Sequence, residues 1–95
     1  MYENKYTLLR DKYLEELSHL ADETKKGYRT VINNFGKSIN YKDIFNKQDI
    51  IDYLNSEGFQ SLEVSSQNSY KTKLKAFLLF FISYLLYFMF YGRNF

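Results

Sequence analysis

Residues 24–35 read TKKGYRTVINNF, and residues 66–77 read SQNSYKTKLKAF. Each segment carries a tyrosine, an aliphatic residue and a phenylalanine at steps of three and four positions. Steps of this size place side chains on one face of an α-helix. Lysine, arginine and asparagine occupy most of the positions between them. The two segments therefore predict two amphipathic helices, each with a buried aromatic stripe and a basic or polar outer face.

The N-terminal part of the chain repeats this period. Leu9, Tyr13, Leu17 and Leu20 follow one another at steps of four, four and three residues. This spacing predicts a first helix over residues 4–19, with one apolar face toward the core.

The second helix has recognisable end signals. Asp22 is a favourable N-cap, and Glu23 lies in the first turn, where a negative charge stabilises the positive end of the helix dipole. Gly36 follows the last buried residue and is expected to end the helix as its C′ residue.

The remaining elements follow from similar signals. Residues 37–46 are expected to form a connection, after which Asn46 caps a short third helix over 47–56 that Gly58 ends. The fourth helix begins near Ser65 and continues to about Tyr91. The sequence thus predicts an all-α fold, a four-helix bundle with a long apolar C-terminal helix.

Composition limits what such a chain does. Its 95 residues are enough for one small domain, and the absence of proline fits a mostly helical one. Without cysteine and with His19 as the single histidine, the chain lacks ordinary zinc-site and thiol chemistry. We expect no metal, no cofactor and no enzymatic activity. The charged N-terminus has no secretory apolar region, so a cytoplasmic location is expected.

The charges are unevenly distributed along the chain. Residues 22–47 hold six lysine or arginine residues and three acids, and residues 64–95 hold four basic residues and no acid. Residues 48–63 hold four acids and no basic residue. If the two basic stretches meet in space, they form a basic face on a protein whose net charge is only +2.

The order of these segments carries a resemblance to a known family. A long amphipathic helix is followed by T-x3-Y-x2-V-x3-F at 24–35, by DIFNKQDIIDYL at 43–54, and by S-x-N-x-Y-x3-L-x2-F at 66–77. This arrangement resembles the N-terminal core-binding domain of tyrosine recombinases such as phage integrases, a SAM-like bundle of four helices. The similarity covers residues 6–85.

The resemblance implies duplex DNA binding, as a stand-alone or truncated domain in DNA integration or recombination. In that family the second and fourth helices lie against the major groove. Carried over by position, the implied DNA-binding residues are Lys25, Lys26, Arg29, Asn33, Gln67, Asn68, Lys71 and Lys75. The family's catalytic residues belong to a second domain whose motifs this sequence lacks, so the resemblance implies no DNA cleavage by this chain.

The C-terminal end leaves alternatives open. We expect residues 1–85 to form the DNA-binding domain and residues 86–95 to be an apolar tail or the start of a truncated linker. The run over 76–90 is almost entirely apolar but shorter than the roughly 20 residues of a typical spanning helix. A small tail-anchored membrane protein and a helical protein-interaction module therefore remain as rival classes. In the latter the apolar helix would dock on a second copy, or on a recombinase catalytic domain.

Overall fold

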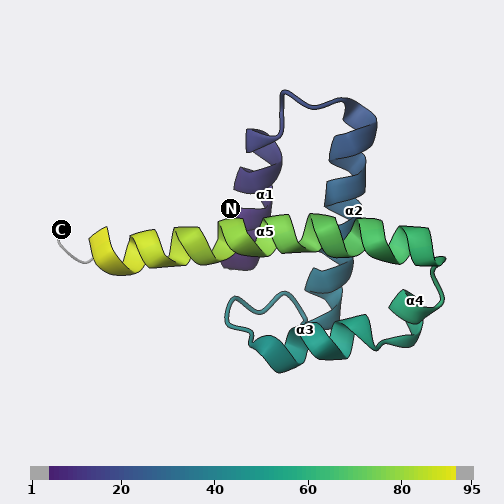
Figure 1. The fold of residues 1–95 in the computed structure, drawn as a ribbon. Helices are drawn as coiled ribbons and strands as arrows, with labels where there is room; N and C mark the ends of the chain where they lie inside the picture. The colour runs from purple at the N-terminus through teal and green to yellow at the C-terminus, as the bar shows by residue number, and fades with distance from the viewer. Residues whose placement is uncertain (1–4, 92–95) are drawn as a thin grey trace.

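The computed structural model describes residues 5–91, and over this range the chain is α-helical without a β-strand. The all-α prediction is confirmed. The helices are α1 (Lys5–Glu16), α2 (Asp22–Ser38), α3 (Lys47–Leu54), α4 (Glu57–Gln60) and α5 (Val64–Tyr91). Figure 1 shows α5 crossing in front of α1 and α2, while α3 and α4 run along its lower side. Residues 1–4 and 92–95, which include Asn4 and Arg93, lie outside the described residues.

The core forms where α5 crosses α1 and α2. Tyr6 of α1 lies at its centre, fully buried, and its hydroxyl donates a 2.7 Å hydrogen bond to the backbone carbonyl of Ile32. Its ring contacts the rings of five other aromatic residues at centroid distances of 5.6–6.4 Å. The buried set is Tyr6, Leu9, Val31, Ile32, Phe35, Ile39, Tyr53, Phe59, Leu74, Phe77 and Phe81. The predicted stripe of the first helix began at Leu9 and missed Tyr6, one turn earlier.

Helix α1 is shorter than predicted. It ends at Glu16, and residues 17–20 continue as turns with 2.9–3.2 Å backbone hydrogen bonds to carbonyls three residues earlier. Leu17 and Leu20 are therefore only half-buried, beyond the end of the helix.

Two predicted ends of α2 are wrong. The N-cap is Ala21, without a side-chain hydrogen bond, and Asp22 is the first helical residue. Gly36 lies inside the helix, which continues to Ser38 and stops where Asn40 and Tyr41 both take a φ of 56°. Because the rings of Tyr6 and Tyr41 pack directly against Gly36, the glycine is required for space and not for a left-handed turn.

The described residues form five helices instead of the expected four, because the chain around Gly58 is itself a short helix, α4. Ser56 accepts a hydrogen bond from the backbone N–H of Phe59 and caps α4, and Gly58 is the second residue of that helix. Phe59 is buried and tilted against the ring of Tyr53 at a centroid distance of 5.5 Å. Burial of Phe59 favours the helical turn of α4. The sequence did not predict this turn, because Gly58 was expected to end the preceding helix.

The predictions for α3 and α5 hold better. Asn46 caps α3 in a complete capping box: its side chain accepts from the N–H of Asp49, whose carboxylate accepts from the N–H of Asn46. Helix α5 runs unbroken through residues 86–91 of the predicted tail. Among the helices described over residues 5–91, none combines the length and apolar character needed to cross a membrane.

Candidate nucleic-acid interface

The eight predicted DNA-binding side chains lie on α2 and α5, and these two helices cross in contact with each other. They do not form a single cluster. The structure distributes them over the outer face of α2, the side of α2 near α1, the N-terminal end of α5, and the flank of α5 that faces α3.

On the outer face of α2, Lys26 and Arg29 are exposed to solvent. Lys25 is half-buried, and its Nζ lies 3.5 Å from a carboxylate oxygen of Asp22, one turn earlier. Since an ion pair between an exposed carboxylate and a lysine contributes little stability, Lys25 is held only weakly in this position.

Asn33 faces α1 and already has a partner. Its side-chain oxygen accepts a 3.2 Å hydrogen bond from the guanidinium of Arg10, which also contacts the carboxylate of Asp11 at 2.9 Å. Base recognition by Asn33 would require this hydrogen bond to break.

Gln67 is similarly engaged. Its side-chain amide donates to the backbone carbonyl of Leu62 at 2.9 Å and to that of Gln60 at 3.4 Å. These bonds fasten the first turn of α5 to the end of α4, which is a structural role. The neighbouring Asn68 is exposed.

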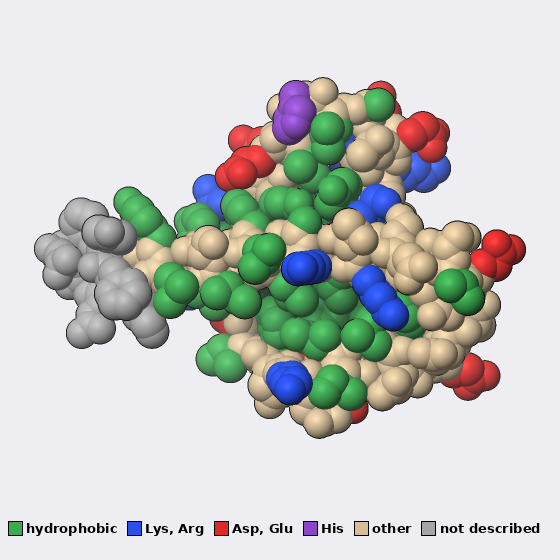
Figure 2. Space-filling view, viewed as in Figure 1, with side chains coloured by type: hydrophobic (Ala, Val, Ile, Leu, Met, Phe, Trp, Pro, Cys, Tyr) green, Lys and Arg blue, Asp and Glu red, His purple; other side chains and the backbone are tan. Residues whose placement is uncertain are grey.

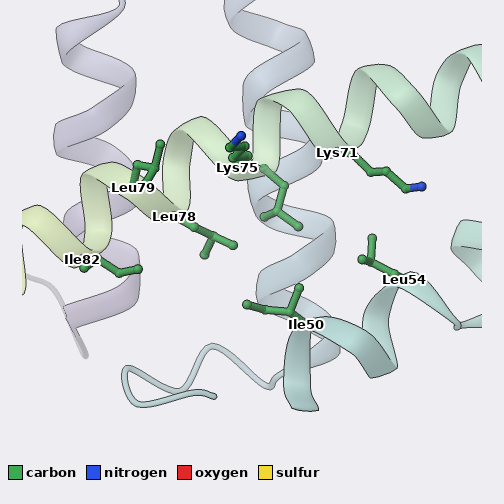
Figure 3. A pocket seen from close by; sticks show the side chains of 8 residues that line it. Ile50, Leu54, Lys71, Lys75, Leu78, Leu79 and Ile82 are labelled. Carbon is green, nitrogen blue, oxygen red and sulfur yellow. The ribbon is translucent and has the colours of Figure 1, made fainter. Parts of the chain in front are cut away.

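Lys71 and Lys75 lie on the flank of α5 that faces α3. Both are exposed, and both line an apolar groove of about 350 Å³ between the two helices. Figure 3 shows their side chains at the upper edge of this groove, with Ile50 and Leu54 of α3 below.

A lysine that the sequence had not assigned to the site faces α2. The Nζ of Lys73 lies 5.6 Å from the centroid of the Tyr28 ring and donates a 2.7 Å hydrogen bond to the hydroxyl of Ser69. Lys73 and Lys26 line the same hollow of about 290 Å³ at the crossing of α2 and α5, to which Glu23 also contributes. The cation–π contact and the hydrogen bond hold this ammonium group at the crossing.

The helical period of the sequence predicts on which flank of α5 Lys73 lies. It lies on the flank of α5 opposite to Lys71 and Lys75, but the sequence does not say which flank packs against α2. The crossing of the helices brings Lys73 into the hollow that Lys26 also lines.

Charged side chains are unevenly distributed over the face of the molecule drawn in Figure 2. In the view of Figure 2, lysine and arginine side chains lie along and beside α5, whereas the acidic side chains are found mainly toward the outline of the molecule. Among residues 5–91 no three His, Asp or Glu side chains come together to form a candidate metal site.

Comparison with known proteins adds no assignment. No protein-family model, no curated protein and no solved structure matches the chain.

Proposed function

We propose that this chain binds duplex DNA through a face formed by α5 and the N-terminal half of α2, and that it does not cleave DNA. The observation that carries the proposal is that Lys26 of α2 and Lys73 of α5 line the same hollow at the helix crossing. It joins the two basic stretches of the sequence at one place. As part of this proposal, the five helices form a SAM-like bundle similar to recombinase core-binding domains, with α4 as an additional short helix.

The chemistry of this face suits the phosphate backbone. Lys26, Arg29, Lys71 and Lys75 are exposed, and Lys73 is half-buried with its ammonium group fixed by Ser69. Lysines that contact phosphates release condensed counterions, and this release supplies most of the sequence-independent affinity for DNA.

Base reading has less support than backbone binding. The amides of Asn33 and Gln67 make hydrogen bonds within the protein, so that the exposed amide at the predicted site is that of Asn68. A single amide reads one adenine edge at most, with about 1–3 kcal/mol of discrimination. We therefore propose binding that depends on phosphate contacts and shows little sequence preference.

Three tyrosines of the described chain are unsuited to nucleophilic attack. A tyrosine that attacks a phosphodiester must be activated, either by a neighbouring base or by a lowered pKa. Burial does the opposite here: it raises the pKa of Tyr53 to about 12, and it also raises the pKa of Tyr6 and Tyr13. These phenols act as core residues.

Charge reversal tests the proposal. The variant carrying Lys26→Glu and Lys73→Glu should bind a labelled 20-base-pair duplex at least tenfold more weakly than the wild type in fluorescence anisotropy at 50 mM salt. The matched control carries Lys12→Glu on α1 and Lys37→Glu in the last turn of α2, which changes the net charge by the same amount. Circular dichroism checks that both variants are folded. Equal losses in the two variants would show that only net charge matters and would refute this assignment of the face.

A further inference from the structure

The groove between α5 and α3 has an apolar floor that the DNA proposal does not use, although its edge residues Lys71 and Lys75 also belong to the proposed DNA face. Its floor is apolar and comes from both helices: Leu74 and Leu78 on α5, Ile50 and Leu54 on α3. Figure 3 shows Ile50 and Leu54 directed upward to the side of α5 that carries Leu78. The groove has a volume of about 350 Å³, at the lower end of the range of small-molecule pockets in proteins.

The apolar surface continues beyond the groove along α5. Leu79 and Ile82 line its open end and are 58% and 51% exposed, and Leu86 follows one turn later at 47%. Steps of three and four residues keep these side chains on one face of the helix. From Leu74 to Leu86 this stripe is about 18 Å long at 1.5 Å per residue, which matches about three turns of a docked helix.

The charged residues that line the groove, within the part of the chain that the structure describes, are both positive. Lys71 and Lys75 form its α5 edge. On α3, Lys47 precedes Ile50 by three residues and so lies on the same helix face. Asp49 is turned away toward Lys42, whose ammonium group it contacts at 3.0 Å.

We infer that the groove binds an amphipathic helix of another protein, one with an apolar stripe flanked by aspartate or glutamate. Docking of such a helix in a groove is an established mode of peptide recognition. The apolar residues would cover Leu78, Leu79 and Ile82, while the acidic flanks meet Lys71 and Lys75. Complementary charge of this kind sets specificity and orientation more than affinity.

A second copy of the chain fits the groove less well. Its most exposed apolar helix is α5, but residues 64–95 contain four basic residues and no acid. Pairing α5 with the groove of another copy would bring cations next to Lys71 and Lys75. Charge therefore favours a different, acidic partner, and this inference does not depend on DNA binding.

Two synthetic peptides test the inference. Each has 18 residues with leucines at i, i+4, i+7 and i+11; the flanking positions are glutamate in one peptide and lysine in the other. In fluorescence anisotropy at 50 mM salt, the glutamate peptide should bind at least tenfold more tightly than the lysine peptide. The difference should shrink at 0.5 M salt, where charges are screened. Equal binding of the two peptides, or no binding of either at 1 mM protein, overturns the inference.

Variants locate the site. The pair Leu79→Gln and Ile82→Gln changes exposed side chains and should lower the affinity for the glutamate peptide at least tenfold. The matched pair Ile44→Gln and Val64→Gln, at positions 83% and 72% exposed outside the groove, should leave it unchanged. Equal effects of the two pairs contradict a groove site.

Charge reversal and self-association complete the test. Lys71→Glu with Lys75→Glu should reverse the preference, so that the lysine peptide binds more tightly. Sedimentation velocity of the wild type should give a monomer. A dimer that disappears with Leu79→Gln and Ile82→Gln would identify a second copy as the occupant and overturn the acidic-helix inference.

Discussion

Replacing Gly36 with alanine is predicted to destabilise the protein, against the usual helix propensity. Gly36 lies inside α2, where alanine is normally favoured by about 1 kcal/mol. A Cβ at this position, however, would lie 2.6 and 2.8 Å from two carbons of the Tyr41 ring and 2.9 Å from a carbon of the Tyr6 ring. Tyr6 is fully buried and hydrogen-bonded, so its ring has little room to move.

The magnitude follows from the two opposing effects. Overpacking of a well-packed core typically costs about 1–3 kcal/mol, and contacts below 3.0 Å with two rings place Gly36→Ala toward the upper part of that range. After subtraction of the propensity gain, we expect a net loss of about 1–2 kcal/mol in the free energy of unfolding. For a domain of this size each kcal/mol corresponds to a fall of roughly 4–8 °C in Tm.

The other helical glycines provide matched controls. At Gly58 a Cβ meets nothing within 4 Å, so Gly58→Ala should stabilise the protein by about 0.5 kcal/mol. At Gly27 the nearest atom is the flexible Cε of Lys73 at 3.2 Å, and the effect should be close to neutral or slightly stabilising. Urea unfolding followed by circular dichroism at 222 nm gives all three values. If Gly36→Ala is as stable as the wild type, the packing described around Tyr6 and Tyr41 is wrong.

Two further predictions concern hydrogen bonds. Tyr6→Phe removes the buried bond to the carbonyl of Ile32 while keeping the ring, and should cost about 1 kcal/mol in urea unfolding; no change would mean that the hydroxyl makes no net contribution. The backbone N–H of Asn46, followed by Lys42, lowers the pKa of Asp49 below its ordinary value of 3.8. The stabilisation from this carboxylate is therefore present above pH 3.8 and lost as the pH falls below it. The stability difference between the wild type and Asp49→Asn should shrink over that acid range, and a constant difference would contradict the role of the charge.

The helices were predictable wherever a local pattern determines them. The Tyr28–Phe35 and Tyr70–Phe77 stripes follow the helical period, and their six stripe residues are buried or half-buried as expected. The capping of α3 by Asn46 depends on residues three positions apart, so local sequence was sufficient. Gly36 and Gly58 were both predicted to end a helix, because glycine is common just after the last helical residue. In the structure each lies inside a helix. At Gly36 the rings of Tyr6 and Tyr41, distant in sequence, leave no room for a side chain. At Gly58 no such contact exists, and the helical turn there accompanies the burial of the neighbouring Phe59.

The candidate site was predictable by residue type but not by geometry. The period places lysines on the outer faces of two helices, yet it does not fix the angle at which those helices cross. The period therefore does not indicate that Lys73 lies at the crossing. The resemblance assigned to DNA the amides of Asn33 and Gln67, which in the structure bond to Arg10 and to backbone carbonyls. Arg10 is 23 residues from Asn33, and the carbonyls that Gln67 contacts lie in or next to the turn between α4 and α5. Helical periodicity does not predict contacts of either kind.

The central claim is phosphate-dominated DNA binding, and a salt series on the wild-type chain tests it most directly. Affinity for the 20-base-pair duplex should fall steeply between 50 and 200 mM salt. With five candidate cations on the face and a slope near −0.9 per phosphate contact, the logarithm of the association constant should fall against the logarithm of salt concentration with a slope of about −3 to −4.5. An affinity that does not change with salt, or the absence of binding at 50 mM, would contradict the account.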